Sequence, residues 1–414
     1  MPIRLAVVND PRYAAQPDPQ SPGRRGELAD VLLLRAVHRF NRFIRPDAVV
    51  VLGRLVDDPR APEAPELAAR LHEILSLLAM PWFGNFDDAF ADLRENRHSG
   101  ALSGYGRRGD GDWAPRALCE APFPYGLIDV ADDGGVEIAV ETLALDPALA
   151  LVDCHTHTDL AYCNEDMAIP DTARLAAVFG LAGVGVSEHS GALYFNPRDY
   201  GGAAGGRVYL LGLDGRREPS RVAEYFARFH GESTEASLTP ALGMEVDFDR
   251  FGKPVIERDV WDKLDFRLGA IHALSTLLPG AQAPEAEARE EFLFMASAVA
   301  RSGVDALAHP FRVFRRAPGG GRPVPPELFE PTARLLRRHG VAAEINFHTN
   351  EPEPEFFRLC LDMGVRIVFG SDAHNRYEVG EFYPHLRFLE AVAPGAASDA
   401  ARTFRRLPGA GKAR

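Results

Sequence analysis

ALALVDCHTH, residues 148–157, is the first of seven short apolar runs that each end at or near a histidine or a carboxylate. Apolar runs of this length are typical of strands that are buried on both faces, as in a parallel sheet. The seven runs are ALALVDCHTH (148–157), LAGVGVSEH (181–189), TPALGMEVD (239–247), FRLGAIH (266–272), VDALAHP (304–310), VAAEIN (341–346) and VRIVFGSDAH (365–374). They predict an α/β fold built on parallel strands.

The polar ends of these runs occupy equivalent positions. In a closed parallel barrel the carboxyl ends of all strands meet on one face, so ligands that are far apart in the sequence would share one pocket. A single His-x-His at a strand end is more often a polar terminus than a pair of ligands. The same residue types at seven successive strand ends are not expected of a purely structural barrel. Imidazoles and carboxylates that converge in this way favour a hydrolytic metal centre.

The order, residue types and strand context of these motifs resemble the polymerase and histidinol phosphatase (PHP) family over about residues 150–390. The resemblance implies a distorted seven-stranded β/α barrel, two to three divalent ions (zinc, manganese or iron) and the hydrolysis of phosphoesters. Glu245 would be the carboxylate that bridges two ions. The metal ligands implied by the resemblance are His155, His157, His189, Glu245, His272, His309, Asp372 and His374.

Cys163 departs from the best-known form of this pattern. Many members of the family have a further His or Asp six residues after the second His of the first motif, and Cys163 stands at that place here. A thiolate is a good zinc ligand and would favour zinc over manganese. The alternatives are a packed cysteine, or a ligand role for Asn164 or Asp166.

Hydrolysis of a phosphate ester requires an activated water and neutralisation of charge. A bound divalent ion lowers the pKa of its water to about 7, and a second ion can stabilise the leaving oxygen. Asp372 and His374 are candidate catalytic residues, either as ligands or as proton carriers. Arg312, three residues after His309, is the best candidate for a cation that faces the phosphate, because arginine presents paired donors.

Further candidates lie outside the motifs. Arg376 and Arg198 come next as phosphate contacts, and a solvated surface position is the alternative for each. His348 is either an acid or a loop histidine without a role. The long loops at 190–222 and 275–287 are expected to form the rim of the substrate site, because long loops in a compact domain are usually functional or mobile.

Bulk properties narrow the class of protein. A chain of 414 residues, 46% of them hydrophobic, is long enough for two domains with large cores. The net charge of −13 argues against a broad basic surface for nucleic acid, but it does not exclude a local basic groove. The four cysteines do not form a disulfide framework, and no signal peptide or apolar run of membrane length is expected. We expect a cytoplasmic protein with no membrane partner and leave its oligomeric state open.

The first 145 residues alternate between predicted strands and helices, which indicates a separate sheet with parallel crossovers. Buried strands are predicted at 4–9, 47–52 and 80–83, helices at 28–42 and 67–78, and two antiparallel strands within 124–144. The three strand ends are Asn9-Asp10-Pro11-Arg12, Gly53-Arg54-Leu55-Val56-Asp57-Asp58 and Gly84-Asn85-Phe86-Asp87. They resemble the calcineurin-like metallophosphoesterases in degenerate form.

That family carries Asp-x-His, Gly-Asp-x-x-Asp and Gly-Asn-His-Asp at these three places. Asp10 and Asn85 keep the ligand types, whereas Arg12, Arg54 and Phe86 replace the others. A cation in place of the bridging carboxylate would repel two metal ions. We therefore expect Arg12 or Arg54 to take the metal space and to pair with Asp10. Such a domain would be a scaffold, a dimerisation surface or a lid, and the alternative is an ordinary α/β domain with polar strand ends.

We thus predict a degenerate metallophosphoesterase-like domain over 1–147, a PHP-type barrel over 148–392 and a flexible tail over 393–414. The favoured function is a metal-dependent phosphatase that acts on a small phosphorylated metabolite or nucleotide.

Two other functions remain open. A phosphodiesterase or 3′-to-5′ exonuclease with the same metal site would need a groove lined by aromatic and basic residues. The visible hint of such a groove is Tyr194, Phe195 and Tyr200 near Arg198, and core packing explains these aromatics equally well. The non-enzymatic alternative is a metal-binding interaction protein.

Overall fold

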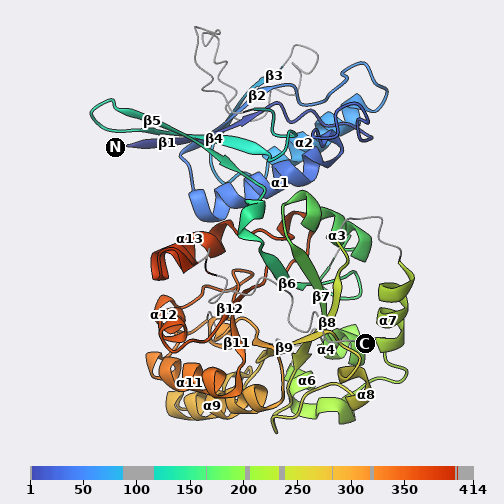
Figure 1. Ribbon diagram of the computed structural model, residues 1–414, viewed down its shortest axis with the longest axis vertical. Coiled ribbons are helices and arrows are strands. Elements are labelled where there is room, and N and C mark those ends of the chain that lie inside the picture. The colour runs from blue at the N-terminus through green and yellow to red at the C-terminus, as the bar shows by residue number, and fades with distance from the viewer. Residues whose placement is uncertain are drawn as a thin grey trace. The chain divides into compact units, whose positions relative to one another are not determined.

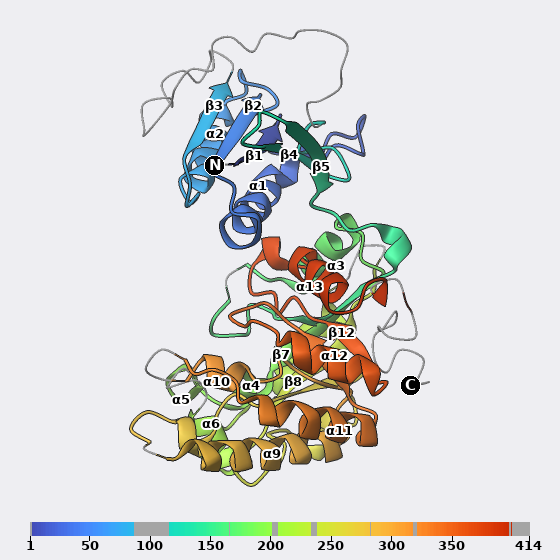
Figure 2. The same cartoon turned by 90° about the vertical axis from the view of Figure 1, so that its left-hand side faces the viewer.

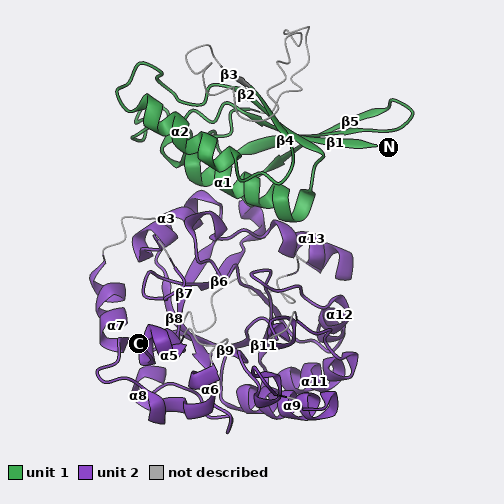
Figure 3. Cartoon of the chain, turned by 180° about the vertical axis from the view of Figure 1, so that it is seen from behind, with its two compact units in different colours: residues 1–145 green, residues 146–414 purple. Residues whose placement is uncertain are grey.

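The structure is a computed structural model that describes residues 2–86, 116–164, 166–200, 206–232, 238–281, 283–317, 321–396 and 399. Its chain forms two compact units, Met1–Leu145 and Asp146–Arg414 (Figure 3). Asp87, residues 201–205 of the first predicted rim loop and most of the predicted tail lie outside the described residues. Among the described residues, none of the helices combines the length and hydropathy that a membrane span requires.

The first unit contains a five-stranded mixed sheet with the order β3-β2-β1-β4-β5 (Figure 1). Strands β1, β2 and β3 pair in parallel, and β4 pairs antiparallel with both β1 and β5. The strands are β1 (Ile3–Asn9), β2 (Ala48–Gly53), β3 (Trp82–Phe86), β4 (Pro124–Val130) and β5 (Val136–Thr142). The helices are α1 (Ala29–Arg39), which continues as a π-helical turn over Phe40–Ile44, and α2 (Ala64–Leu75).

Helix α1 packs through one apolar face. Its residues Leu32, Leu33 and Ala36 are fully buried, at the spacing of three and four that places side chains on one side of a helix. Phe40 extends this stripe and meets the ring of Tyr125 on β4 edge to face, with centroids 5.3 Å apart. The five-stranded sheet confirms the predicted separate sheet of the first unit, whereas the metallophosphoesterase-like character of this unit stays a prediction.

The second unit is a closed barrel of seven parallel strands, in the order β6-β7-β8-β9-β10-β11-β12 with β12 pairing back to β6. The predicted barrel is confirmed. All seven predicted runs supply a strand, although the fifth supplies only two residues before the chain turns. The strands are β6 (Val152–Thr156), β7 (Gly183–His189), β8 (Ala241–Asp247), β9 (Phe266–Ala270), β10 (Ala306–Leu307), β11 (Ala342–Ile345) and β12 (Ile367–Phe369).

Helices surround this ring of strands, as two perpendicular views show (Figures 1 and 2). Several are single turns that follow a strand directly, which places them beside the strand ends. The helices are α3 (Ile169–Val178), α4 (Ser190–Tyr194), α5 (Pro197–Tyr200), α6 (Gly206–Leu211), α7 (Val222–Gly231), α8 (Arg258–Trp261), α9 (Glu285–Arg301), α10 (Arg312–Arg315), α11 (Phe329–His339), α12 (Pro354–Asp362) and α13 (Tyr383–Val392).

The barrel is filled by small and apolar side chains. One buried cluster draws Val152 and Cys154 from β6, Phe266 and Leu268 from β9, and further residues from β10, β11 and β12. The fully buried ring of Phe266 also lies against β8, where Gly243 leaves room for it. A Cβ atom at Gly243 would lie 2.2 Å from Cζ of this ring. Gly243 is therefore required by packing in this layer of the barrel.

We expect the substitution Gly243→Ala to lower the free energy of unfolding of the barrel by about 1–3 kcal/mol, because the added methyl group must displace Phe266. Chemical denaturation of the full chain provides the measurement. Gly231→Ala is the matched control, because nothing lies within 4 Å of the added Cβ there. The control should change the free energy by no more than about 0.5 kcal/mol. Equal stability of the two variants would contradict this account of the barrel packing.

Candidate metal centre

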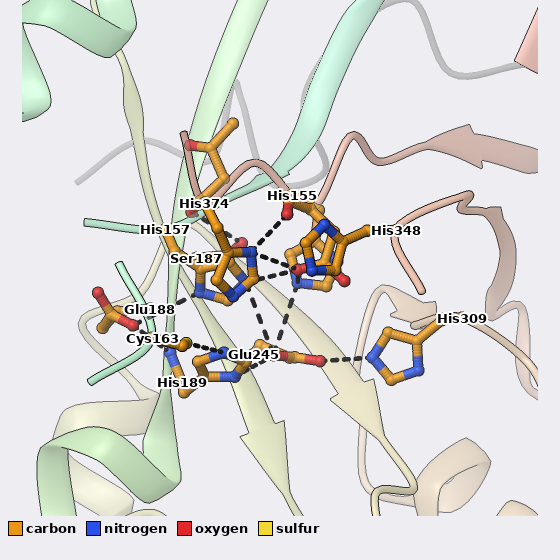
Figure 4. A network of polar contacts seen from close by, with 12 residues as sticks. His155, His157, Cys163, Ser187, Glu188, His189, Glu245, His309, His348 and His374 are labelled. Carbon is orange, nitrogen blue, oxygen red and sulfur yellow. Dashed lines mark hydrogen bonds and ion pairs between the residues drawn. The ribbon is translucent and has the colours of Figure 1, made fainter. Parts of the chain in front are cut away.

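The carboxyl ends of the barrel strands bring the predicted metal ligands together. His155 lies within β6, His189 ends β7 and Glu245 lies near the end of β8. The other predicted ligands follow the ends of β6, β9, β10 and β12: they are His157, His272, His309, Asp372 and His374. Figure 4 shows Glu245 between His189 and His309, with a contact to each. These side chains form four groups.

The first group consists of the donor atoms of His155, His157, Glu245 and Asp372. His155 Nε2 lies 3.5 Å from Glu245 Oε2 and 3.5 Å from Asp372 Oδ1. His157 Nε2 lies 2.9 Å from Asp372 Oδ1 and 3.9 Å from Glu245 Oε2. An ion bound tetrahedrally at about 2.1 Å places its ligands about 3.4 Å apart, so this spacing fits a divalent metal.

Two of these atoms also lack hydrogen-bond partners. His155 Nε2 and Glu245 Oε2 are buried and make no hydrogen bond of normal geometry, although His189 Nδ1 lies 2.5 Å from Glu245 Oε2. A buried lone pair without a donor destabilises the fold, unless a cation binds it. Burial raises the pKa of Glu245, but His272, His189 and His155 outweigh it and hold this pKa well below its usual range. Glu245 is therefore an ionised carboxylate in a dry site.

Glu344, on β11, fixes the orientation of this group. Its Oε1 lies 2.7 Å from His155 Nδ1, so Nε2 is left to face the other donors. Its Oε2 accepts the backbone N–H of His309 at 2.6 Å. Gly370 makes room for Glu344, because a Cβ atom there would lie 1.8 Å from Oε1. Such partners set the tautomer and direction of a ligating histidine.

The second group consists of His157, His189 and His374, whose ligand atoms lie within 4.8 Å of one another. His374 Nδ1 lies 2.6 Å from the carbonyl oxygen of Asp372 and donates to it, which leaves Nε2 with a free lone pair. Burial, reinforced by the charge of His157, lowers the pKa of His374 to about 3. Burial and the same neighbour also lower the pKa of His189. These two lowered pKa values favour the neutral rings that metal ligands require, whereas burial of His157 is outweighed by Asp372 and Glu188, which raise its pKa to about 9.

Cys163 lies beside the second group. Its Sγ is 4.0 Å from His189 Nε2, close to the separation of about 3.6 Å that a tetrahedral zinc ion imposes on sulfur and nitrogen ligands. The two alternatives lie elsewhere, because Asn164 donates to the carbonyl of Thr158 at 2.8 Å and Asp166 is exposed. Among the three residues, Cys163 lines the cavity above the site.

The third group consists of Glu245, His272 and His309, and an arginine already contacts it. Two of its residues also belong to the set His189, Glu245 and His272, whose ligand atoms lie within 4.8 Å of one another. Glu245 Oε1 lies 3.1 Å from His272 Nε2 and 2.6 Å from His309 Nε2. Arg312 Nη2 lies 3.0 Å and 2.6 Å from the same two nitrogens. Arg312 is 4% exposed, and its Nη1 donates to Asp372 Oδ2 at 2.5 Å. These three donors therefore do not fit a metal ion while Arg312 holds this position.

A fourth group, His348, His374 and Glu378, was not predicted as a unit. The ring of His348 stacks on that of His374, with centroids 4.4 Å apart and planes 13° apart. His348 Nδ1 lies 3.6 Å from Glu378 Oε1, and Glu378 Oε2 accepts the backbone N–H of His374 at 2.8 Å. Glu378 stands four residues after His374, which was the available signal in the sequence.

A cavity of about 360 Å³ opens above these groups. Arg316, four residues after Arg312, lines it and was missed by the sequence analysis. Arg198 and Arg376 do not line it. Among the described residues, the lining consists of Cys163, His189, Tyr200, Asp247, Ile271, His272, Arg312, Val313, Arg316, His348, Thr349, His374 and Asn375. Of the aromatic residues considered for a strand-binding groove, Tyr200 lines the cavity, whereas Tyr194 and Phe195 are buried.

The corresponding strand ends of the first unit hold an ion pair. Asp10 accepts the backbone N–H of Arg54 at 2.8 Å, and its Oδ2 lies 3.5 Å from Arg12 Nη2. Arg12 also lies 3.8 Å from Asp57. As far as the described residues extend, every set of donors spaced to hold a metal ion lies in the second unit. The pairing of Asp10 with Arg12 agrees with the expectation from charge balance.

Comparison with known proteins places the chain near phosphatases. It is 27% identical over 251 residues to a probable phosphatase of Acetivibrio thermocellus, a match that covers 58% of this chain and 87% of the other. It is 26% identical over 270 residues to a probable histidinol-phosphatase of Deinococcus radiodurans, covering 58% and 91%. It is 28% identical over 156 residues to the probable phosphatase YcdX of Escherichia fergusonii, covering 36% and 54%. No family model matches the chain. The names of these relatives support a phosphatase.

The substitution Glu344→Gln tests the support of the first group. The amide removes a charge and offers a donor where His155 and His309 each require an acceptor, so we expect metal affinity to fall about 10–100-fold. Competition with a chelator of known affinity measures this loss. Glu330→Gln, on the exposed face of α11, is the control and should bind metal as the wild type does. Wild-type affinity in Glu344→Gln would show that Glu344 does not orient the ligands.

Proposed function

We propose that the chain is a metal-dependent phosphatase of the PHP type that acts on a small phosphorylated metabolite or nucleotide. The observation that carries the proposal is the convergence of buried imidazoles on the buried carboxylate of Glu245, which contacts His189 and His272 in the lining of a cavity. The names of the relatives support the same activity.

The proposed centre draws on two of the donor groups. His155, His157, Glu245 and Asp372 would hold one divalent ion, and His189, His374 and Cys163 would contribute to a second site. Ions bound there would supply Lewis acidity and an activated water nucleophile. Imidazole and thiolate ligands favour zinc, whereas the carboxylates also suit manganese or iron. In this assignment Asp372 and His374 act as ligands.

The cavity favours a small substrate. A volume of about 360 Å³ is at the low end of the range for small-molecule sites, and it suits a phosphorylated metabolite better than an extended nucleic acid strand. Arg316 lines this cavity without belonging to a donor group, so its guanidinium is proposed to bind the phosphate oxygens that face away from the metals.

His348 is the proposed proton donor to the leaving group. It lines the cavity, and Glu378 and the His374 ring hold it from two sides. A proton delivered to the ester oxygen as the bond breaks is worth most when that oxygen is a strong base. His348 therefore matters for natural alkyl phosphates more than for activated aryl phosphates.

Metal content and turnover test the proposal together. We expect purified wild-type protein to contain divalent metal by inductively coupled plasma mass spectrometry and to hydrolyse p-nitrophenyl phosphate. Glu245→Ala should lose metal and at least about 10²-fold of this activity, because Glu245 contributes to the first donor group and neighbours the second. Turnover of bis-p-nitrophenyl phosphate alone would identify a phosphodiesterase instead. A wild type that contains no metal and stays inactive after zinc and manganese are added would refute the proposed enzyme. The non-enzymatic alternative, a binding protein, would then remain.

Leaving-group dependence tests His348. We expect His348→Gln to reduce kcat for an alkyl phosphate by about 10²–10⁴-fold, and kcat for p-nitrophenyl phosphate by less than about 10-fold. His339→Gln, at the exposed end of α11, is the control and should leave both rates unchanged. An equal loss on both substrates would assign His348 a role in structure or binding.

A further inference from the structure

We propose that the guanidinium of Arg312 takes the place of a third metal ion, so that the centre holds two divalent ions and one arginine. The inference deepens the proposed function and rests on it, since it assumes that the first two donor groups bind metal. It concerns the third group, Glu245, His272 and His309, whose donors converge as metal ligands do.

The Nε2 atoms of the third group already have polar neighbours on two sides, because Glu245 Oε1 lies 2.6 Å from His309 Nε2 and 3.1 Å from His272 Nε2. Arg312 Nη2 lies 2.6 Å from His309 Nε2 and 3.0 Å from His272 Nε2, and these are hydrogen-bond distances. A neutral imidazole has one ring nitrogen with a lone pair, and that lone pair serves either an N–H donor or a metal ion. A metal at about 2.1 Å from both nitrogens would displace the Nη2 atom.

The surroundings of His272 and His309 agree with this role. Asp247 Oδ1 lies 2.6 Å from His272 Nδ1 and accepts a hydrogen bond from it, which fixes the ring with Nε2 facing Arg312 and Glu245. His309 Nε2 lies 2.6 Å from both Arg312 Nη2 and Glu245 Oε1, so a metal ion on this nitrogen would have to displace the guanidinium.

Arg312 also supplies the charge that a metal would supply. Its Nη1 donates to Asp372 Oδ2 at 2.5 Å, and its Nη2 lies 3.8 Å from Glu245 Oε1. Asp372 and Glu245 are both fully buried, so each needs a cation nearby. The guanidinium thus contacts the two carboxylates of the first donor group from the side of the third.

The backbone holds Arg312 in this position. His309 and Phe311, on either side of Pro310, have φ angles of 28° and 70°, in the left-handed region that residues with side chains rarely adopt. Phe311 is anchored by contacts with the rings of Phe292 and Phe356, at centroid distances of 5.1 and 4.9 Å. This tight turn starts α10 with Arg312 and directs its guanidinium back onto His309.

The proposal has a chemical consequence. An arginine contributes one positive charge and N–H donors, but it carries no exchangeable water and does not dissociate into a chelator. The third position can therefore stabilise negative charge but cannot supply a nucleophile. Activation of water falls entirely to the two positions formed by the first and second donor groups.

Metal stoichiometry provides the first test. Wild type and variants are loaded with Zn²⁺, and in parallel with Mn²⁺, freed of excess metal and measured by inductively coupled plasma mass spectrometry. We expect two ions per chain in the wild type and three in Arg312→Ala, since the three donors then become free. Arg316→Ala is the matched control and should retain two ions, because Arg316 belongs to no donor group.

A second pair of variants keeps the proposal testable if Arg312→Ala does not fold. In the wild-type background, His272→Ala should retain two ions because His272 binds arginine, whereas His374→Ala should lose one. In Arg312→Ala, the additional substitution His272→Ala should remove the third ion again.

Three results would overturn the inference. They are three ions in the wild type, two ions in a folded Arg312→Ala, and the loss of an ion in His272→Ala alone. A wild type that binds no metal would instead overturn the proposed function, and the inference with it. Two ions in the wild type with no phosphatase turnover would refute the proposed activity. The metal content of Arg312→Ala and His272→Ala would then still decide the role of Arg312.

Discussion

The burial of carboxyl groups at one end of the barrel is the constraint on which the rest of the site depends. Glu188, Glu245, Glu344 and Asp372 are all fully buried, and water cannot solvate them there. Each therefore needs a cation, an imidazole or a backbone N–H within reach. The strand ends supply these partners from six different strands, which explains why the ligands are scattered over more than half of the chain.

The partners form layers around Glu245. Next to it lie the imidazoles, and behind several of them lies an acceptor that fixes the ring, such as Glu344 at His155 and Asp247 at His272. The outer set depends on the barrel itself, because Gly370 leaves the space that Glu344 occupies. Barrel packing and ligand orientation therefore depend on each other, since a shift of one strand moves the acceptor that orients a histidine as well as the packed side chains.

In both units an arginine neutralises a carboxylate at a strand end. In the first unit Arg12 lies beside Asp10 at the end of β1, and in the second Arg312 lies beside Asp372 and two imidazoles. In each case the arginine follows a turn with positive φ angles, which brings a long side chain back toward the strand end. A covalently attached cation neutralises a carboxylate at all metal concentrations, whereas a bound ion does so only when it is available.

The sequence alone determined the barrel, because seven continuous apolar runs fit strands that are buried on both faces of a parallel sheet. The histidines and carboxylates at the ends of these runs indicated a metal centre. Tertiary structure decided which polar side chains reach that centre. Arg316 lines the cavity and Arg198 does not, although both are arginines on loops or short helices. Arg312 turns inward onto His309 instead of facing the open cavity alone. These choices depend on φ angles and aromatic contacts in the connecting turns. Such turns have no sequence signal comparable to the continuous apolar run of a buried parallel strand.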